Sequence, residues 1–149
     1  MLGGEKLNKE ENVDIEVLKS LIEHSNGVVT SQTYFIQVPN SFMRNKDLNI
    51  YEKSLYLYIW GYGGDRRGAY PSHGAMIEHL GISKSTVKRS LKSLEEKGGI
   101  CILNRIKKGT NEKSTNIYYL AEIDVNDGTF IKESIDIVKK IYPDKIVYI

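Results

Sequence analysis

Apolar residues recur along this chain at helical spacing in some stretches and in short β-prone runs in others. A period of 3.6 residues indicates an amphipathic helix, and a short run rich in β-branched and aromatic residues indicates a strand. The pattern predicts helices over residues 14–25, 50–62, 73–80, 84–97 and 129–142. It predicts strands over residues 100–103 and 116–120, and a short strand or extended arm over residues 34–38.

Capping residues mark the ends of the central helices. Asn49 followed by Glu52 is typical of a capping box, and Ser72 follows Pro71 as the N-cap of the next helix. Gly81 can enter the left-handed conformation that ends a helix, and Ser83 can cap a new one two residues later. Two short helices joined by such a tight turn are typical of a helix-turn-helix, whose second helix contacts DNA. On the helix before them we expect a core side formed by Tyr51, Leu55, Tyr58, Ile59 and Tyr62.

The second helix of this pair has a narrow apolar stripe and a basic face. Val87, Leu91 and Leu94 lie at i, i+4 and i+7, which places them on one side of the helix. The residues that point away from this stripe are Ser85, Thr86, Lys88, Arg89 and Lys92. An ordinary amphipathic helix with a solvated basic face is the alternative, and for an isolated helix we would favour it.

The segment that follows favours DNA binding. Residues 100–103 and 116–120 flank the polar, basic run NRIKKGTNEKST at 104–115, which predicts a β-hairpin beside the recognition helix. Such a hairpin is a wing, which can contact phosphates or the minor groove. The predicted fold is therefore α+β, mostly α: a winged helix-turn-helix with N- and C-terminal helical extensions. The candidate DNA-binding residues are Lys84, Ser85, Thr86, Lys88, Arg89, Lys92, Arg105, Lys107, Lys108 and Lys113.

The charge distribution supports this placement. The whole chain carries only +2, but residues 81–115 hold nine Lys or Arg against three Glu, a local charge of +6. Residues 1–33 carry −3 and residues 116–149 carry −2. Positive charge confined to one segment suits a polyanion bound at one surface.

The chain divides into a central domain with two extensions. We expect an N-terminal extension over 1–33, with its first twelve residues disordered, a winged helix-turn-helix over 34–125, and a C-terminal helical extension over 126–149. The helix predicted at 129–142 has a wide apolar stripe that includes Ile131, Ile135 and Val138. This stripe needs a partner surface, either the domain's own core or a second subunit. We expect a homodimer, since helix-turn-helix proteins often bind two successive major grooves.

Catalytic, metal and membrane patterns are missing from the sequence. His73 and His79 lie six residues apart, which is not the spacing of a helical zinc site, and we expect them to be exposed or capping residues. No phosphate-binding loop or nucleophile motif occurs, so we expect neither an enzyme nor a cofactor. We expect Cys101 to be a buried strand residue. Because no apolar run approaches ~20 residues and the N-terminus is polar and acidic, we expect a cytoplasmic protein without membrane contact.

Several runs of the sequence resemble one family of DNA-binding domains. They are YFIQVPN at 34–40, LNIYEKSLY at 48–56, LGISKSTVKRSL at 80–91 and NIYYL at 116–120. Together they resemble the winged helix-turn-helix domain of replication initiator and replisome-organiser proteins from plasmids and phages of Gram-positive bacteria.

The resemblance implies a function for the predicted surface. It implies binding to repeated sites in double-stranded DNA at an origin or operator, with possible replisome proteins as further partners. It also implies base contacts by Ser85, Thr86 and Arg89, and backbone contacts by the wing lysines. A transcriptional regulator, a plasmid partition protein and a winged helix used for protein–protein assembly are the alternatives.

Overall fold

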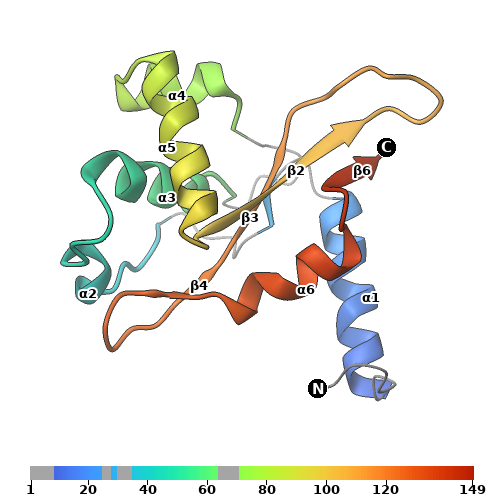
Figure 1. Ribbon diagram of the computed structural model, residues 1–149, viewed down its shortest axis with the longest axis horizontal. Helices are drawn as coiled ribbons and strands as arrows, with labels where there is room; N and C mark the ends of the chain where they lie inside the picture. The colour runs from blue at the N-terminus through green and yellow to red at the C-terminus, as the bar shows by residue number, and fades with distance from the viewer. Residues whose placement is uncertain (1–8, 25–27, 30–34, 64–70) are drawn as a thin grey trace.

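The computed structural model describes residues 9–24, 28–29, 35–63 and 71–149 (Figure 1). Its helices are α1 (Lys9–His24), α2 (Asn40–Met43), α3 (Ile50–Gly63), α4 (His73–Leu80), α5 (Lys84–Glu96) and α6 (Glu133–Ile141). Its strands are β1 (Val28–Val29), β2 (Ile100–Ile106), β3 (Ile117–Leu120), β4 (Glu122–Ile123), β5 (Phe130–Ile131) and β6 (Ile146–Tyr148). The predicted α+β class is confirmed.

A four-stranded sheet in the order β1-β3-β2-β6 runs through the middle of the molecule. Its centre is the antiparallel pair β2–β3, in which Ile100 lies opposite Leu120 and Leu103 opposite Ile117. The outer strands come from the two ends of the chain, and both are parallel to their neighbours: β1 to β3 and β6 to β2. The predicted hairpin is thus confirmed, and it is flanked by strands from both extensions.

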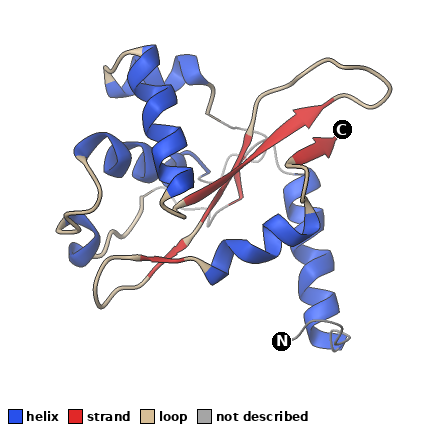
Figure 2. Cartoon of the chain, in the orientation of Figure 1, coloured by secondary structure: helices blue, strands red, loops and turns tan. Residues whose placement is uncertain are grey.

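Helices α3, α4 and α5 pack together on one face of this sheet, as Figure 2 shows. Alternation along β2 and β3 turns Ile100 and Tyr118 toward these helices. The core on this side also contains the buried side chains of Phe42, Leu55, Ile59, Met76, Val87, Leu91 and Leu94.

Helices α1 and α6 cover the opposite face. Cys101 and Leu103 of β2 point to this side, where they pack with Ile22 of α1, Val138 of α6 and Val147 of β6. Cys101 is buried, as predicted. The apolar stripe of α6 is therefore covered by the chain's own sheet and α1. Of the two partner surfaces considered for it, the domain's own core is the one that the structure shows.

The buried face of α3 differs from the predicted one. Tyr51 is 44% exposed, whereas Glu52 and Tyr56 lie in the interior together with Leu55 and Ile59. This helix is apolar around most of its circumference, so its periodicity does not select a face. The capping box does form, because the Asn49 side chain accepts from the Glu52 N–H at 2.9 Å and Glu52 accepts from the Asn49 N–H at 2.8 Å.

The predicted limits of the terminal elements were wrong in several places. Helix α1 begins at Lys9, so residues 9–12 are helical where disorder was predicted, while residues 1–8 and the predicted boundary at 33/34 lie outside the described residues. Helix α6 begins only at Glu133, since residues 130–131 form a strand paired with β4. Residues 35–38 are not part of a strand. None of the described helices is long and apolar enough to cross a membrane.

Candidate nucleic-acid interface

The turn between α4 and α5 is built as the sequence predicts. The Ser72 side chain accepts from the Ala75 N–H at 3.0 Å at the start of α4. Gly81 ends this helix with φ +67°, a conformation that glycine adopts without a steric penalty. The Ser83 side chain then accepts from the Thr86 N–H at 3.2 Å and so begins α5.

Helix α5 buries one face and exposes the other. Val87, Ser90, Leu91 and Leu94 are its buried residues, which confirms the predicted stripe. The exposed side chains on the remaining surface include Lys84, Ser85, Lys88, Arg89 and Lys92.

Thr86 occupies the edge between these faces. It is half-buried, and its hydroxyl lies 2.8 Å from the Ser83 hydroxyl in the cap. The Ser85 hydroxyl lies 3.1 Å from the same atom. Both predicted base-contacting hydroxyls are therefore held close to the first turn of α5.

The wing carries exposed basic side chains at its end. Lys107, Lys108 and Lys113 are all exposed, and Lys107 forms an ion pair with Glu112 at 3.1 Å. An exposed pair of this kind contributes little to stability, so Lys107 can exchange its partner for a phosphate at small cost. The last residue of the sequence also holds this loop, because the Lys108 N–H donates to the Ile149 carbonyl at 2.8 Å.

Arg105 is not at the surface where a DNA contact was predicted. Its side chain is only 5% exposed. Its Nε donates to the Thr115 carbonyl at 2.9 Å, and its guanidinium donates to the hydroxyls of Ser114 at 3.2 Å and Thr115 at 2.7 Å. The alternation of β2 explains this, because Arg105 lies two residues after Leu103 on the same buried face. Arg105 therefore holds the base of the wing, and we do not include it among the proposed DNA contacts.

Lys97 also has a structural role. Its Nζ lies 2.9 Å from the fully buried carboxylate of Glu52 and donates to the Asp47 carbonyl at 2.7 Å. All of the nine basic residues between 81 and 115 except Arg105 are exposed, and the seven without Lys97 lie on α5 and the wing: Lys84, Lys88, Arg89, Lys92, Lys107, Lys108 and Lys113.

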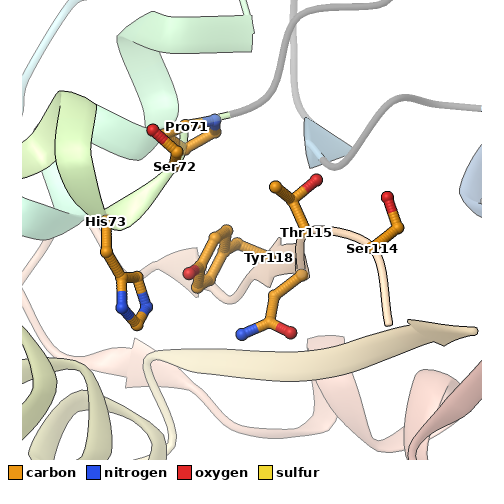
Figure 3. Close-up of a pocket in the computed structure, with 7 residues that line it drawn as sticks. Pro71, Ser72, His73, Ser114, Thr115 and Tyr118 are labelled. Carbon is orange, nitrogen blue, oxygen red and sulfur yellow. The ribbon is translucent and has the colours of Figure 1, made fainter. Parts of the chain in front are cut away.

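A pocket between α4 and the wing contains residues that the sequence did not single out as a site. Pro71, Ser72 and His73 line one side, and Ser114, Thr115, Asn116 and Tyr118 line the other (Figure 3). His73 is half-buried rather than exposed. Burial, and then the charges of Lys88 and Lys84 on α5, lower the pKa of His73 below its usual 6.5. The only signal in the sequence was its position directly after the N-cap of α4.

The comparison with known proteins gives one match. Residues 46–100 match the family model of a helix-turn-helix domain. The matched segment contains α3, α4 and α5 and ends at the first residue of β2. The fold is a winged helix-turn-helix. No curated protein and no solved structure matches the chain.

The match supports DNA binding by this winged helix-turn-helix. The matched segment includes all of α5 but not the loop and second strand of the wing. The wing is identified from the pairing of β2 with β3. Among the described residues, no group of three or more His, Cys, Asp or Glu side chains is arranged to hold a metal ion.

Proposed function

We propose that this chain binds double-stranded DNA in a sequence-specific manner, with α5 in the major groove and the wing against the flanking backbone. The observation that carries the proposal is the exposed basic surface on these two elements of a winged helix-turn-helix. Recognition helices of this class contact base edges from the major groove, while phosphate contacts fix the position of the protein on the duplex.

The exposed side chains differ in what they can contribute. Arg89 can donate two hydrogen bonds to O6 and N7 of guanine, an arrangement worth about 1–3 kcal/mol of discrimination. Ser85 and Thr86 are proposed to contact base edges near the start of α5.

The lysines supply affinity without sequence preference. Lys84, Lys88 and Lys92 are spaced four residues apart and therefore form a row along one side of α5. Together with Lys107, Lys108 and Lys113 they are proposed to neutralise phosphates, each adding about −0.9 to the slope of log affinity against log salt.

The finer role rests on the resemblance to replication initiators. We propose that the chain binds repeated sites at an origin or operator of a plasmid or phage and acts in replication initiation. A transcriptional regulator or a partition protein would use the same surface, so the biological output depends on where its sites lie.

Selection of bound duplexes from a random pool tests DNA binding directly. We expect the full chain to enrich one sequence, and the spacing of recovered half-sites to report how many copies bind together. Absence of binding to any duplex at low salt would contradict the proposal and favour the alternative of a protein–protein assembly module.

A further inference from the structure

A pocket, called here the His73 pocket, lies between the start of α4 and the wing. It is lined by Ser72, His73, Ser114, Thr115 and Asn116, with Pro71 and Tyr118 completing its walls. In Figure 3, His73 lies on one side, Ser114 and Thr115 lie on the other, and Tyr118 stands between them. Its volume is about 180 Å³, far above the ~10–15 Å³ that one water requires, so a phosphate group fits.

The wing side of this pocket is rich in hydrogen-bond donors. The hydroxyls of Ser114 and Thr115 both accept from the guanidinium of Arg105. A hydroxyl that accepts in this way still has its own hydrogen to donate. The buried Arg105 fixes these two hydroxyls at the base of the wing, and the side-chain amide of Asn116 adds a further donor group on this side of the pocket.

The electrostatic environment also favours an anion. Burial, and then the positive charges of Lys88 and Lys84 on α5, lower the pKa of His73, so these two lysines add positive potential at the His73 side of the pocket. The described residues that line the pocket include no acidic side chain. Tyr118 contributes no negative charge near neutral pH, since burial raises its pKa to about 12.

We propose that the His73 pocket holds one backbone phosphate of bound DNA, at the point where the strand passes from α5 to the wing. This inference rests on the proposed function. It assigns His73 and Asn116, which face each other across the pocket, as the phosphate contacts.

Occupation of the pocket by a phosphate couples DNA binding to protonation. The free protein disfavours the charged imidazole, because His73 is half-buried beside Lys84 and Lys88. A phosphate at contact distance favours the imidazolium and raises the pKa of His73, by about 1–3 units for an opposite charge within ~4–6 Å. DNA affinity therefore increases as pH falls through the pKa that His73 has in the complex, with a one-unit rise in pKa corresponding to a tenfold gain.

NMR titration of the histidine ring signals tests this proposal in the full chain. His79 is the internal reference, because it lies on the same helix but its Nδ1 contacts the Tyr58 hydroxyl at 2.6 Å outside the pocket. We expect a DNA duplex at low salt to raise the pKa of His73 by at least about one unit, while the ring signals of His79 should coincide in the free and bound chain. An unchanged His73 pKa in a chain that binds the duplex would overturn the pocket assignment while leaving the proposed function intact. Absence of duplex binding would overturn both.

A second titration with inorganic phosphate separates the two sources of the anion. If free phosphate at millimolar concentration raises the pKa of His73 but the duplex does not, the pocket is a site for a free anion and the proposal fails. If the duplex raises it at much lower concentration, the backbone phosphate is the ligand.

Substitution gives an independent readout. At about pH 6, His73→Ala should make the slope of log affinity against log salt less steep by about 0.9, and His73→Gln should remove the pH dependence. His79→Ala is the matched control and should change neither quantity. Equal slopes for wild type, His73→Ala and His79→Ala would contradict the proposed contact.

Discussion

The side chain of Glu52 connects the start of α3 with the end of α5. Its carboxylate is fully buried, and it accepts from the Asn49 N–H at 2.8 Å and from the Ser93 hydroxyl at 2.6 Å. It also lies 2.9 Å from Lys97 Nζ. One carboxylate thus caps α3 and holds the last turns of α5. A buried ion pair is not in itself stabilising, but removal of one partner leaves the others unsatisfied.

Glu52→Gln should lower the free energy of unfolding at neutral pH by roughly 1.5–3 kcal/mol, the range for hydrogen bonds to a charged group. Burial by itself raises the pKa of Glu52, but the hydrogen bonds from Ser93 and Asn49 and the charge of Lys97 outweigh it, so the pKa lies below 4.5. A lowered carboxyl pKa stabilises the folded state above the unfolded pKa, and this stabilisation is lost as pH falls through the folded value.

Denaturant unfolding of wild type and Glu52→Gln at several pH values measures this effect. The stability difference should be largest near neutral pH and should shrink below about pH 4.5. Glu96→Gln is the control, because Glu96 is exposed on the same helix as Ser93, and it should change stability by less than about 0.5 kcal/mol. A difference that stays constant with pH would show that the charge of Glu52 is not involved.

Among the secondary-structure elements, α6 packs its apolar stripe against the rest of the same chain. Ile135 and Val138 are fully buried, and Val138 packs with Cys101 and Val147. The stripe that suggested a dimer interface is consequently occupied by the chain's own sheet.

Ile135→Ala should therefore destabilise the single chain by about 2–5 kcal/mol, as expected when a buried isoleucine is truncated. Ile50→Ala makes the same chemical change at a residue that is 61% exposed, and it should cost less than about 0.5 kcal/mol beyond its effect on the helix terminus. Thermal or denaturant unfolding at several protein concentrations measures both variants. A loss for Ile135→Ala that depends on protein concentration would instead place this residue in an intermolecular interface.

Local signals predicted the elements whose ends are set by neighbouring residues. The caps at Asn49, Ser72 and Ser83 and the left-handed Gly81 fixed the starts of α3, α4 and α5 and the turn, and all of them form as predicted. Strand alternation could also have placed Arg105 correctly, because it shares a face with buried Leu103.

Pairing between strands distant in sequence leaves no such local signal. Strands β1, β4, β5 and β6 have only two or three residues, too few for an alternating pattern, and β1 and β6 pair with strands distant in sequence. In the turn before β6, Lys145 has φ +61°. This left-handed conformation is uncommon for lysine, so the sequence does not predict it. The His73 pocket likewise joins residues about forty positions apart.

For the whole molecule, the two ends of the chain support the wing from either side. Strand β6 pairs with β2 along Asn104, Arg105 and Ile106, and the Ile149 N–H donates to the Ile106 carbonyl at 2.9 Å. Strand β1 pairs with β3 on the other side. We therefore propose that the terminal segments belong to the same folding unit as the DNA-binding core.

Removal of residues 145–149 tests this unity. The shortened chain loses the acceptors of the Asn104 and Lys108 N–H groups, the carbonyls of Lys145 and Ile149, each at 2.8 Å. Hydrogen exchange at these two amides should become faster, and the affinity for duplex DNA should fall because the wing is held less firmly. Unchanged exchange and unchanged affinity would show that β6 does not support the wing.

We propose that α5 selects the DNA sequence while the wing supplies affinity. The most direct measurement is the affinity of wild type, Arg89→Ala and Lys108→Ala for a selected duplex and for a scrambled one, across a range of salt concentrations. Arg89→Ala should reduce the ratio of selected to scrambled affinity by about 5- to 150-fold, equivalent to about 1–3 kcal/mol. Lys108→Ala should weaken both duplexes alike and make the salt slope less steep by about 0.9. Equal, unselective losses from both substitutions would contradict the assignment of the recognition surface.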